Sequence, residues 1–372
     1  VFITSFNYFK TTNTYIDDSV NNQTKITKGI SMNLEQTAGA GDYKTVTRSS
    51  WPTEGYKFNT ELSRCENGGE INWDDINKKV IVTGNVSDKC YVYFDIWIPS
   101  IAAYCTSGTD LATCVKNFGD QGPSVSNIYI HNSALTNGAG DNSYRYAGAN
   151  PNNYVCFGSE ATTCPDANLF RIIGVFGDQA KVIRAKSVGD QPWHTSQVNN
   201  WSSSSLNTYL NGTYLTSLGT LAEKIATTTW KVGGGDEANI SFSVPATAYQ
   251  YEVGSSASTT TVDKKIGLMY VSDYYYGASP SAWKLVGYNS SDATKDYRAA
   301  TSTNWLYLGS TEWTISRNSG YTYLAFLVNS AGYVYYSGYV PVSLAVRPSF
   351  NLLSSVKYIS GSGSMSDLVR IN

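Results

Sequence analysis

A tyrosine-rich stretch near the C-terminus, SGYTYLAFLVNSAGYVYYSGYV at residues 319–340, holds the side chains best suited to contact a ligand. Tyrosine combines a flat ring with a hydroxyl and loses little entropy when it is immobilised. The Asn-Ser-Ala-Gly segment indicates a hairpin turn, because Gly332 tolerates a positive φ. Alternation then puts Leu324, Phe326 and Val328 on a core face and the tyrosines opposite. With aromatics of the preceding segment, the expected ligand-binding set is Trp305, Tyr307, Trp313, Tyr321, Tyr323, Tyr333, Tyr335 and Tyr339.

A structural role for these rings is the alternative. The same tyrosines could cover a second layer of the domain's own core, and strands favour aromatic residues in any case. Exposure of the tyrosine face in a single chain would favour recognition, whereas burial between copies of the chain would favour a structural role.

Side chains for catalysis are sparse in this sequence. It has two histidines, His131 and His194, and no GxSxG segment, so a serine triad is not indicated. His194 follows a tryptophan and is expected to pack or to cap a turn. Paired carboxylates could hydrolyse glycosides, but we expect the acidic candidates to be solvated surface groups. These candidates are Asp273, Glu312, Asp236 and Glu237. We therefore predict that the protein is not an enzyme.

The six cysteines favour disulfides over a metal site. They form no CxxC motif, and two histidines are too few to complete a zinc site with them. An even number at loop-like spacings is typical of an oxidising compartment. The sequence allows several pairings, and we favour nearest neighbours because each pair closes a short loop. The favoured pairs are Cys65–Cys90, Cys105–Cys114 and Cys156–Cys164.

Calcium is the remaining metal to consider. Asp141 and Asn142 offer suitable oxygen ligands in the loop NGAGDNSYRYAGANPNN. The loop lacks the regular acidic spacing of a calcium site, so a solvated loop is the better interpretation. No cofactor is predicted.

Composition points away from nucleic acid and toward an exported protein. The chain of 372 residues has only 15% charged residues, 29 tyrosines and a net charge of −2, and it contains no basic run. It also contains neither a long apolar run nor a complete signal peptide. Because it starts with VFITSFNYF and no methionine, we interpret it as a mature or trimmed product that lacks its export segment.

The chain is expected to form four successive parts. Phe2, Phe6, Phe9, Ile16 and Val20 recur at helical spacing, which predicts a helix within residues 1–37. This helix is either a stalk that continues a membrane anchor, as in pilin-like proteins, or a helix that covers a sheet. The other expected parts are a small disulfide-linked β unit at 38–100, an irregular disulfide-containing connection at 101–165, and a domain of short strands at 166–372.

The motifs of the last part resemble a known family. In chain order they are FRIIGVFG, WSSSSLNTYLNG, IGLMYVSDYYYG, NWLYLGSTEWTISRNSG and AVRPSFNL. Together they resemble the C-type-lectin-like domain of bacterial surface proteins, which is related in fold to formylglycine-generating enzymes and to the variable proteins of diversity-generating retroelements. The segment around Cys65 and Cys90 also resembles the region that precedes such domains, which supports their pairing.

This resemblance implies a C-type-lectin-like, mixed α/β domain of short twisted strands whose last strands and loops form an exposed binding face. With the N-terminal helix and the small antiparallel sheet, the predicted fold class is α+β. The related enzymes bind copper through cysteines within this domain, but no cysteine follows Cys164 here. The calcium-binding sugar motifs of animal C-type lectins are absent as well.

Two functions follow as expectations. The first is an extracellular adhesin or receptor-binding protein on a bacterial cell surface, with a protein or glycan ligand on a cell or phage. It would contact a membrane only through a missing N-terminal anchor, and it could self-associate through the N-terminal helix. The alternative is a structural subunit of a pilin-like or other surface filament.

Overall fold

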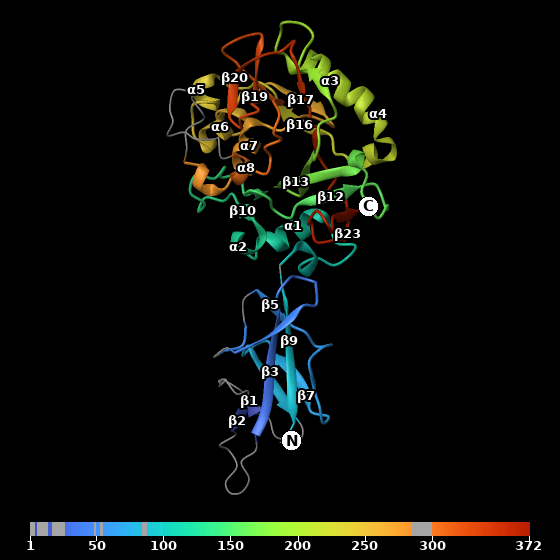
Figure 1. Ribbon diagram of the computed structural model, residues 1–372. Coiled ribbons are helices and arrows are strands. Elements are labelled where there is room, and N and C mark those ends of the chain that lie inside the picture. The colour runs from blue at the N-terminus through green and yellow to red at the C-terminus, as the bar shows by residue number, and fades with distance from the viewer. Residues whose placement is uncertain are drawn as a thin grey trace. The chain divides into compact units, whose positions relative to one another are not determined.

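The structure is a computed structural model that divides at Pro99/Ser100 into two compact units, each described here by itself (Figure 1). The residues that it describes are 4–5, 14–16, 27–47, 50–52, 55–83, 88–97, 99–284 and 300–372. The expected boundary at residue 165 does not coincide with this division, since residues 101–165 lie in the same unit as residues 166–372.

The first unit consists of two sheets. The larger contains β2 (Thr14–Ile16), β3 (Thr27–Glu35), β9 (Lys89–Ile96) and β5 (Tyr56–Phe58) in this order, with β4 (Tyr43–Val46) paired to β3 and β6 (Arg64–Cys65) paired to β9. The smaller contains β1 (Thr4–Ser5), β8 (Lys79–Thr83) and β7 (Glu70–Asp74). Ile30, Met32 and Leu34 alternate with polar residues along β3, and they share one core with Val80 and Val92 from the other strands.

The predicted N-terminal helix is wrong. Strands β1, β2 and β3 lie within residues 1–37, and Ile16 ends β2. Phe2, Phe6, Phe9 and Val20 lie outside the described residues. The physical reason is visible in the sequence, because threonine and asparagine are indifferent helix formers and the apolar residues of β3 recur every second position.

The predicted α+β class is wrong as well. The structure is sheet-rich, with 34% strand and 20% helix among the residues that it describes. The second unit has one sheet in the order β10 (Ile128–Ile130), β11 (Tyr144–Tyr146), β13 (Leu169–Phe176), β12 (Tyr154–Phe157), β24 (Val369–Ile371) and β23 (Tyr358–Ser360). Strand β14 (Gln179–Arg184) joins β13 to β22 (Ser349–Asn351).

A second sheet of this unit carries the tyrosine-rich stretch. Its order is β15 (Asp190–Pro192), β21 (Ser343–Ala345), β18 (Glu312–Arg317), β19 (Leu324–Val328) and β20 (Val334–Tyr339), and a separate ribbon pairs β16 (Thr228–Lys231) with β17 (Thr261–Lys264). The helices are short: α1 (Leu111–Gly119), α2 (Pro123–Ser126), α3 (Ser205–Tyr209), α4 (Leu215–Ser217), α5 (Glu237–Ile240), α6 (Pro245–Glu252), α7 (Val271–Gly277) and α8 (Ala300–Thr303).

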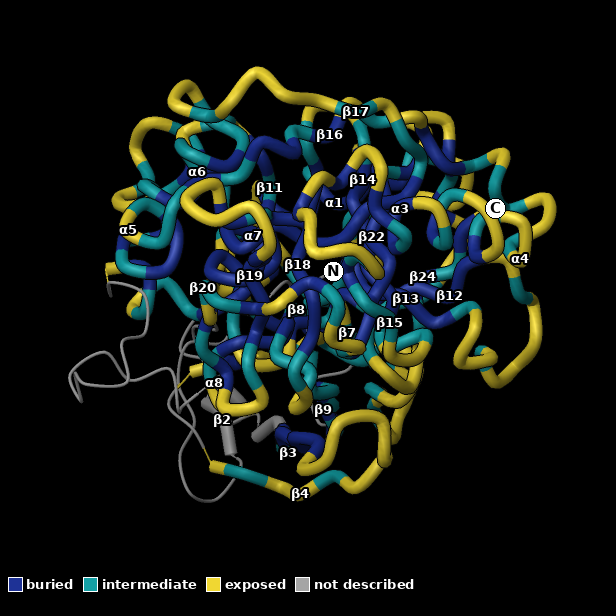
Figure 2. Tube along the Cα trace, turned by 90° about the horizontal axis from the view of Figure 1, so that it is seen from above, coloured by how far each residue is buried: buried dark blue, intermediate teal, exposed yellow. Residues whose placement is uncertain are grey.

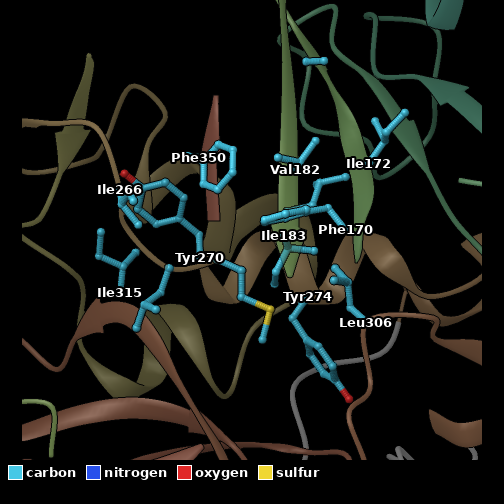
Figure 3. Packing of buried hydrophobic residues seen from close by; sticks show 14 of the residues in the cluster. Phe170, Ile172, Val182, Ile183, Ile266, Tyr270, Tyr274, Leu306, Ile315 and Phe350 are labelled. Atoms are coloured by element: carbon cyan, nitrogen blue, oxygen red, sulfur yellow. The ribbon is translucent and has the colours of Figure 1, made fainter. Parts of the chain in front are cut away.

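One hydrophobic core connects these elements. Phe170 of β13 and Ile183 of β14 lie in the same cluster as Tyr274 of α7 and Ile315 of β18 (Figure 3). Interior strands such as β13 and β14 are accordingly dark blue in Figure 2, while many connecting loops are yellow. The segment VSDYYYG, which lies in the part expected to consist of short strands, forms helix α7 instead. The Asp273 carboxylate caps its first turn by accepting a hydrogen bond from the Tyr270 N–H.

The structure joins the cysteines as Cys65–Cys90, Cys105–Cys114 and Cys156–Cys164, the same pairs that the local spacing favours. No cysteine is free. These disulfides fit a secreted or extracellular protein. Among the residues that the structure describes, no helix has the length and apolar character needed to cross a membrane.

Candidate functional site: tyrosine rows on the β19–β20 hairpin

The expected hairpin turn is present between β19 and β20. The Gly332 N–H donates to the Asn329 carbonyl at 2.8 Å, and the Asn329 N–H donates to the Tyr333 carbonyl at 2.8 Å. Gly332 has a φ of +90°, in the region that favours glycine. Local turn chemistry therefore sets where the tyrosine-rich strand β20 begins.

Four tyrosines of this hairpin and of the turn before it are exposed: Tyr321 (43%), Tyr323 (42%), Tyr335 (39%) and Tyr339 (39%). Tyr321, Tyr323 and Tyr339 form the first tyrosine row, with ring centroids 6.1 and 6.3 Å apart along the row. The second tyrosine row is half-buried Tyr333, exposed Tyr335 and half-buried Tyr336, with centroid distances of 6.4 and 5.4 Å. The Tyr335–Tyr336 contact is tilted and the other three are edge to face. Such contacts hold the rings in place, which favours a pre-organised surface.

The strand register differs from simple alternation. All five residues of β19 are buried, because β19 lies between β18 and β20, and the run LAFLV is apolar on both faces. Tyr321 and Tyr323 precede the strand. Strand β20 contains a bulge, since Ala325 pairs with Gly338 and Leu327 pairs with Tyr335.

The bulged strand also needs a glycine. A Cβ atom on Gly338 would lie 2.6 Å from the Trp313 ring, so the close approach of β20 to this ring requires glycine. Trp313 is itself buried, and its Nε1–H donates to the Gln191 carbonyl at 3.0 Å. It is therefore a core residue beneath β20.

Trp305 and Tyr307 also depart from the expected ligand-binding set. Trp305 is buried, and its Nε1–H donates to the Tyr146 carbonyl at 2.9 Å. Tyr307 is half-buried, and its hydroxyl donates to the Ser330 carbonyl at 2.5 Å, which anchors the hairpin turn. The sequence alone gives no sign of these long-range partners.

The structure adds two residues that the sequence analysis did not select. Tyr336 joins the second row, and Phe242 packs against it with a centroid distance of 5.4 Å. Tyr336 could have been included because it lies in the same YVYY run. Phe242 comes from a segment far away in the sequence, beside α5, and has no local signal.

The acidic candidates for catalysis have structural partners. Asp273 is buried between Lys181, at 2.5 Å, and Arg145, at 3.7 Å. Buried Glu312 accepts two hydrogen bonds from the Arg347 guanidinium, at 2.6 and 2.8 Å. These two carboxylates are thus not the solvated surface groups that we expected.

Asp236 and Glu237 lie at the start of a short helix. The Asp236 side chain caps α5 by accepting a hydrogen bond from the Asn239 N–H at 2.9 Å. Glu237 occupies the first turn of the same helix, where a negative charge is favourable. Their positions are explained by helix capping.

Two groups of possible metal ligands have other partners. Among the described residues, Cys65, Asp88 and Cys90 are close enough to hold an ion, but the two sulfurs form a disulfide. The Asp141 carboxylate accepts hydrogen bonds from Ser143 through Oδ1 and from Arg145 through Oδ2. Because both of its oxygens already accept hydrogen bonds, the Asp141 side chain belongs to a polar network and is not the solvated loop residue that we expected.

The two histidines differ in environment. His131 is fully buried, and its Nδ1 accepts a hydrogen bond from the Ala139 N–H at 3.0 Å. Its ring packs against Tyr276 and Trp283, with centroids 4.5 and 5.1 Å away. Burial, with a contribution from the nearby Arg145 charge, lowers the pKa of His131 to about 2. His194 accepts a hydrogen bond from the Ser196 N–H at 3.2 Å and so caps a turn.

The buried His131 predicts a loss of stability in acid. The pKa of His131 in the folded protein, about 2, lies below its unfolded value of ~6.5. The contribution of His131 to stability is therefore complete above about pH 6.5 and declines as the pH falls toward the folded pKa. Within this window we expect a decline of about 1.4 kcal/mol per pH unit in the free energy of unfolding. Denaturant titrations at several pH values measure it.

The His131→Asn variant should lack this decline, because the amide oxygen can replace Nδ1 as acceptor but does not titrate. His194→Asn is the matched control and should keep it. An unchanged pH dependence in the His131 variant would assign the acid sensitivity to other groups.

Comparison with family models, with curated proteins and with solved structures finds no match to this chain. The resemblance to C-type-lectin-like surface proteins therefore stays a prediction.

Proposed function

We propose that this chain is an extracellular, non-enzymatic ligand-binding protein that contacts its ligand through the two tyrosine rows. The observation that carries the proposal is the exposure of Tyr321, Tyr323, Tyr335 and Tyr339 together with the ring contacts that connect each row. Monomeric proteins seldom expose several large rings side by side without a binding role. Tyrosines supply apolar area and hydroxyls at once, so the ligand is a protein surface or a glycan.

The disulfides support an extracellular location, and the resemblance in sequence supports display on a bacterial cell surface. The partners of Asp273 and Glu312 support the absence of catalysis, since both carboxylates are held in buried ion pairs. The tyrosine rows therefore act by binding.

A structural subunit of a surface assembly is the second candidate. Among the described strands, β20 pairs only with β19, so it is an edge strand of its sheet. An edge strand has backbone groups that can pair with a strand of another copy. In such an assembly the exposed tyrosines would be covered by the neighbouring copy.

Glycan and protein arrays probed with the full chain test the first function. For a ligand found in this way, Tyr323→Ser or Tyr335→Ser should weaken binding by roughly thirtyfold, as loss of an aromatic anchor does. Ile359→Ser is the matched control, because Ile359 is equally exposed (41%) on β23. Equal affinities of all three variants would contradict the proposal, and filaments seen by electron microscopy would favour the second candidate.

A further inference from the structure

A pocket of about 250 Å³ lies in the second unit, apart from the tyrosine rows. Its walls come from β11, β13, β14, β16, α6, α7 and β22, and none of its lining residues belongs to either row. Thr229 is exposed at its rim. Its volume is below that of most drug-sized sites, so it suits a small molecule.

The pocket lining contains more positively charged than negatively charged side chains. Arg145 pairs with Asp141 at 2.7 Å, and Lys181 pairs with Asp273 at 2.5 Å. Lys231 is a third lining cation. Its Nζ donates to the Gly254 carbonyl at 3.2 Å, and within the described part of the chain no carboxylate lies within 4.0 Å of it. The lining therefore has one more cation than carboxylates.

The remaining polar and aromatic groups suit a hydroxylated ring. The Asn351 amide donates to the Thr228 hydroxyl at 3.0 Å, while its Oδ1 is buried and has no hydrogen-bond partner among the described residues. Trp230 and Tyr249 add aromatic surface to the lining. Aromatic side chains pack against the apolar faces of ring-shaped ligands, and buried acceptors without partners favour ligand hydroxyls.

The Lys231 ammonium and the Asn351 amide belong to opposite ends of the wall that β16 forms. Thr228, which contacts Asn351, begins β16, and Lys231 ends it. Three residues of strand separate these ends by roughly 10 Å at ~3.3 Å per residue. The side chains of Thr228 and Lys231, three residues apart, leave the strand on opposite faces. The long Lys231 side chain ends at the Gly254 carbonyl, next to Val253 of the lining, so its ammonium still borders the pocket. A pyranose ring with one charged substituent spans about this length.

We propose that this pocket binds a sugar acid of hexose size, with its carboxylate at the Lys231 ammonium and a ring hydroxyl donating to Asn351 Oδ1. The ligand carboxylate would supply the negative counter-charge that no described carboxylate provides to Lys231. A neutral hexose would leave this cation unpaired, and an amino sugar would add a fourth positive charge.

Three hexoses of matched size and different charge test the proposal: glucuronate, glucose and glucosamine, each titrated into the full chain by calorimetry. Glucuronate should bind at least roughly tenfold more tightly than glucose, because hydrogen bonds between charged groups are the strong ones. Glucosamine should bind least. Equal affinities, a preference for glucosamine, or no binding of glucuronate would overturn the proposal.

A pair of lysine variants locates the site. Lys231→Met removes the charge and keeps the length of the side chain, so it should reduce the affinity for glucuronate to that for glucose. Lys264→Met is the control, because Lys264 is a half-buried lysine on the partner strand β17 and does not line the pocket. If both variants keep wild-type affinity, glucuronate binds elsewhere and the assignment fails. Tyr323→Ser should leave this binding unchanged, which separates the pocket from the tyrosine rows.

Discussion

Arg347→Ala is expected to lower the free energy of unfolding by about 3–5 kcal/mol, because it leaves the Glu312 carboxylate buried without its counterion. Glu312 and Arg347 are both almost fully buried, and two hydrogen bonds join them. Arg347 also donates to the Leu306 carbonyl at 2.5 Å, so the variant loses this bond as well. Urea or guanidinium unfolding curves measure the change.

The dependence on pH distinguishes a lost charge pair from lost packing. Burial raises the pKa of Glu312, and the Arg347 charge opposes this rise. Without Arg347 the folded pKa is higher still, so the destabilisation applies once the pH exceeds the unfolded value of ~4.5 and is relieved below it. The deficit of Arg347→Ala should therefore be smaller at about pH 4 than at about pH 7.

Two further variants complete this test. The double variant Glu312→Leu with Arg347→Met should recover much of the lost stability, since it removes both charges and keeps side-chain volume. Lys186→Ala removes a salt bridge with Asp166 in which both side chains are exposed, and it should stay within ~0.5 kcal/mol of the wild type. A deficit in Arg347→Ala no larger than that of Lys186→Ala would rule out the buried-pair explanation.

Phe326→Ala is expected to destabilise the protein by about 3–5 kcal/mol, whereas Tyr335→Ser should change stability by no more than ~0.5 kcal/mol. Phe326 is fully buried in the interior strand β19, so its removal leaves a cavity. Tyr335 is exposed on the adjacent edge strand β20 and makes ring contacts at the surface. Thermal melts of the two variants compare core and surface within one hairpin.

The same experiment decides whether the tyrosines are free to bind. Leu324→Ala should behave like Phe326→Ala, and Tyr321→Ser and Tyr323→Ser should behave like Tyr335→Ser. If the serine variants lose as much stability as the alanine variants, the tyrosine rows belong to the core and the proposed binding role must be abandoned.

Several local features of this protein follow from short stretches of its sequence. Each cysteine pair closes a short loop, so nearest neighbours in sequence are also neighbours in space. The turn that ends at Gly332 depends on the φ preference of one residue, and the four exposed tyrosines lie within twenty residues of it. In such cases the interacting residues lie close together along the chain, at most 25 residues apart for the cysteine pairs.

The roles of residues that contact distant partners become evident only from the tertiary structure. Trp305 and Trp313 look equivalent to the tyrosines in the sequence, but their indole N–H groups are satisfied by the Tyr146 and Gln191 carbonyls, more than a hundred residues away. The Asp273 carboxylate likewise meets Lys181, 92 residues earlier in the chain, only in the folded structure. The expected helix within residues 1–37 fails in part on local grounds, because the apolar residues of β3 alternate, and the pairing of β3 with β9, remote in sequence, then stabilises this strand. Long-range pairing and burial, which no local pattern encodes, therefore separate the core aromatics and buried ion pairs from the exposed tyrosine rows.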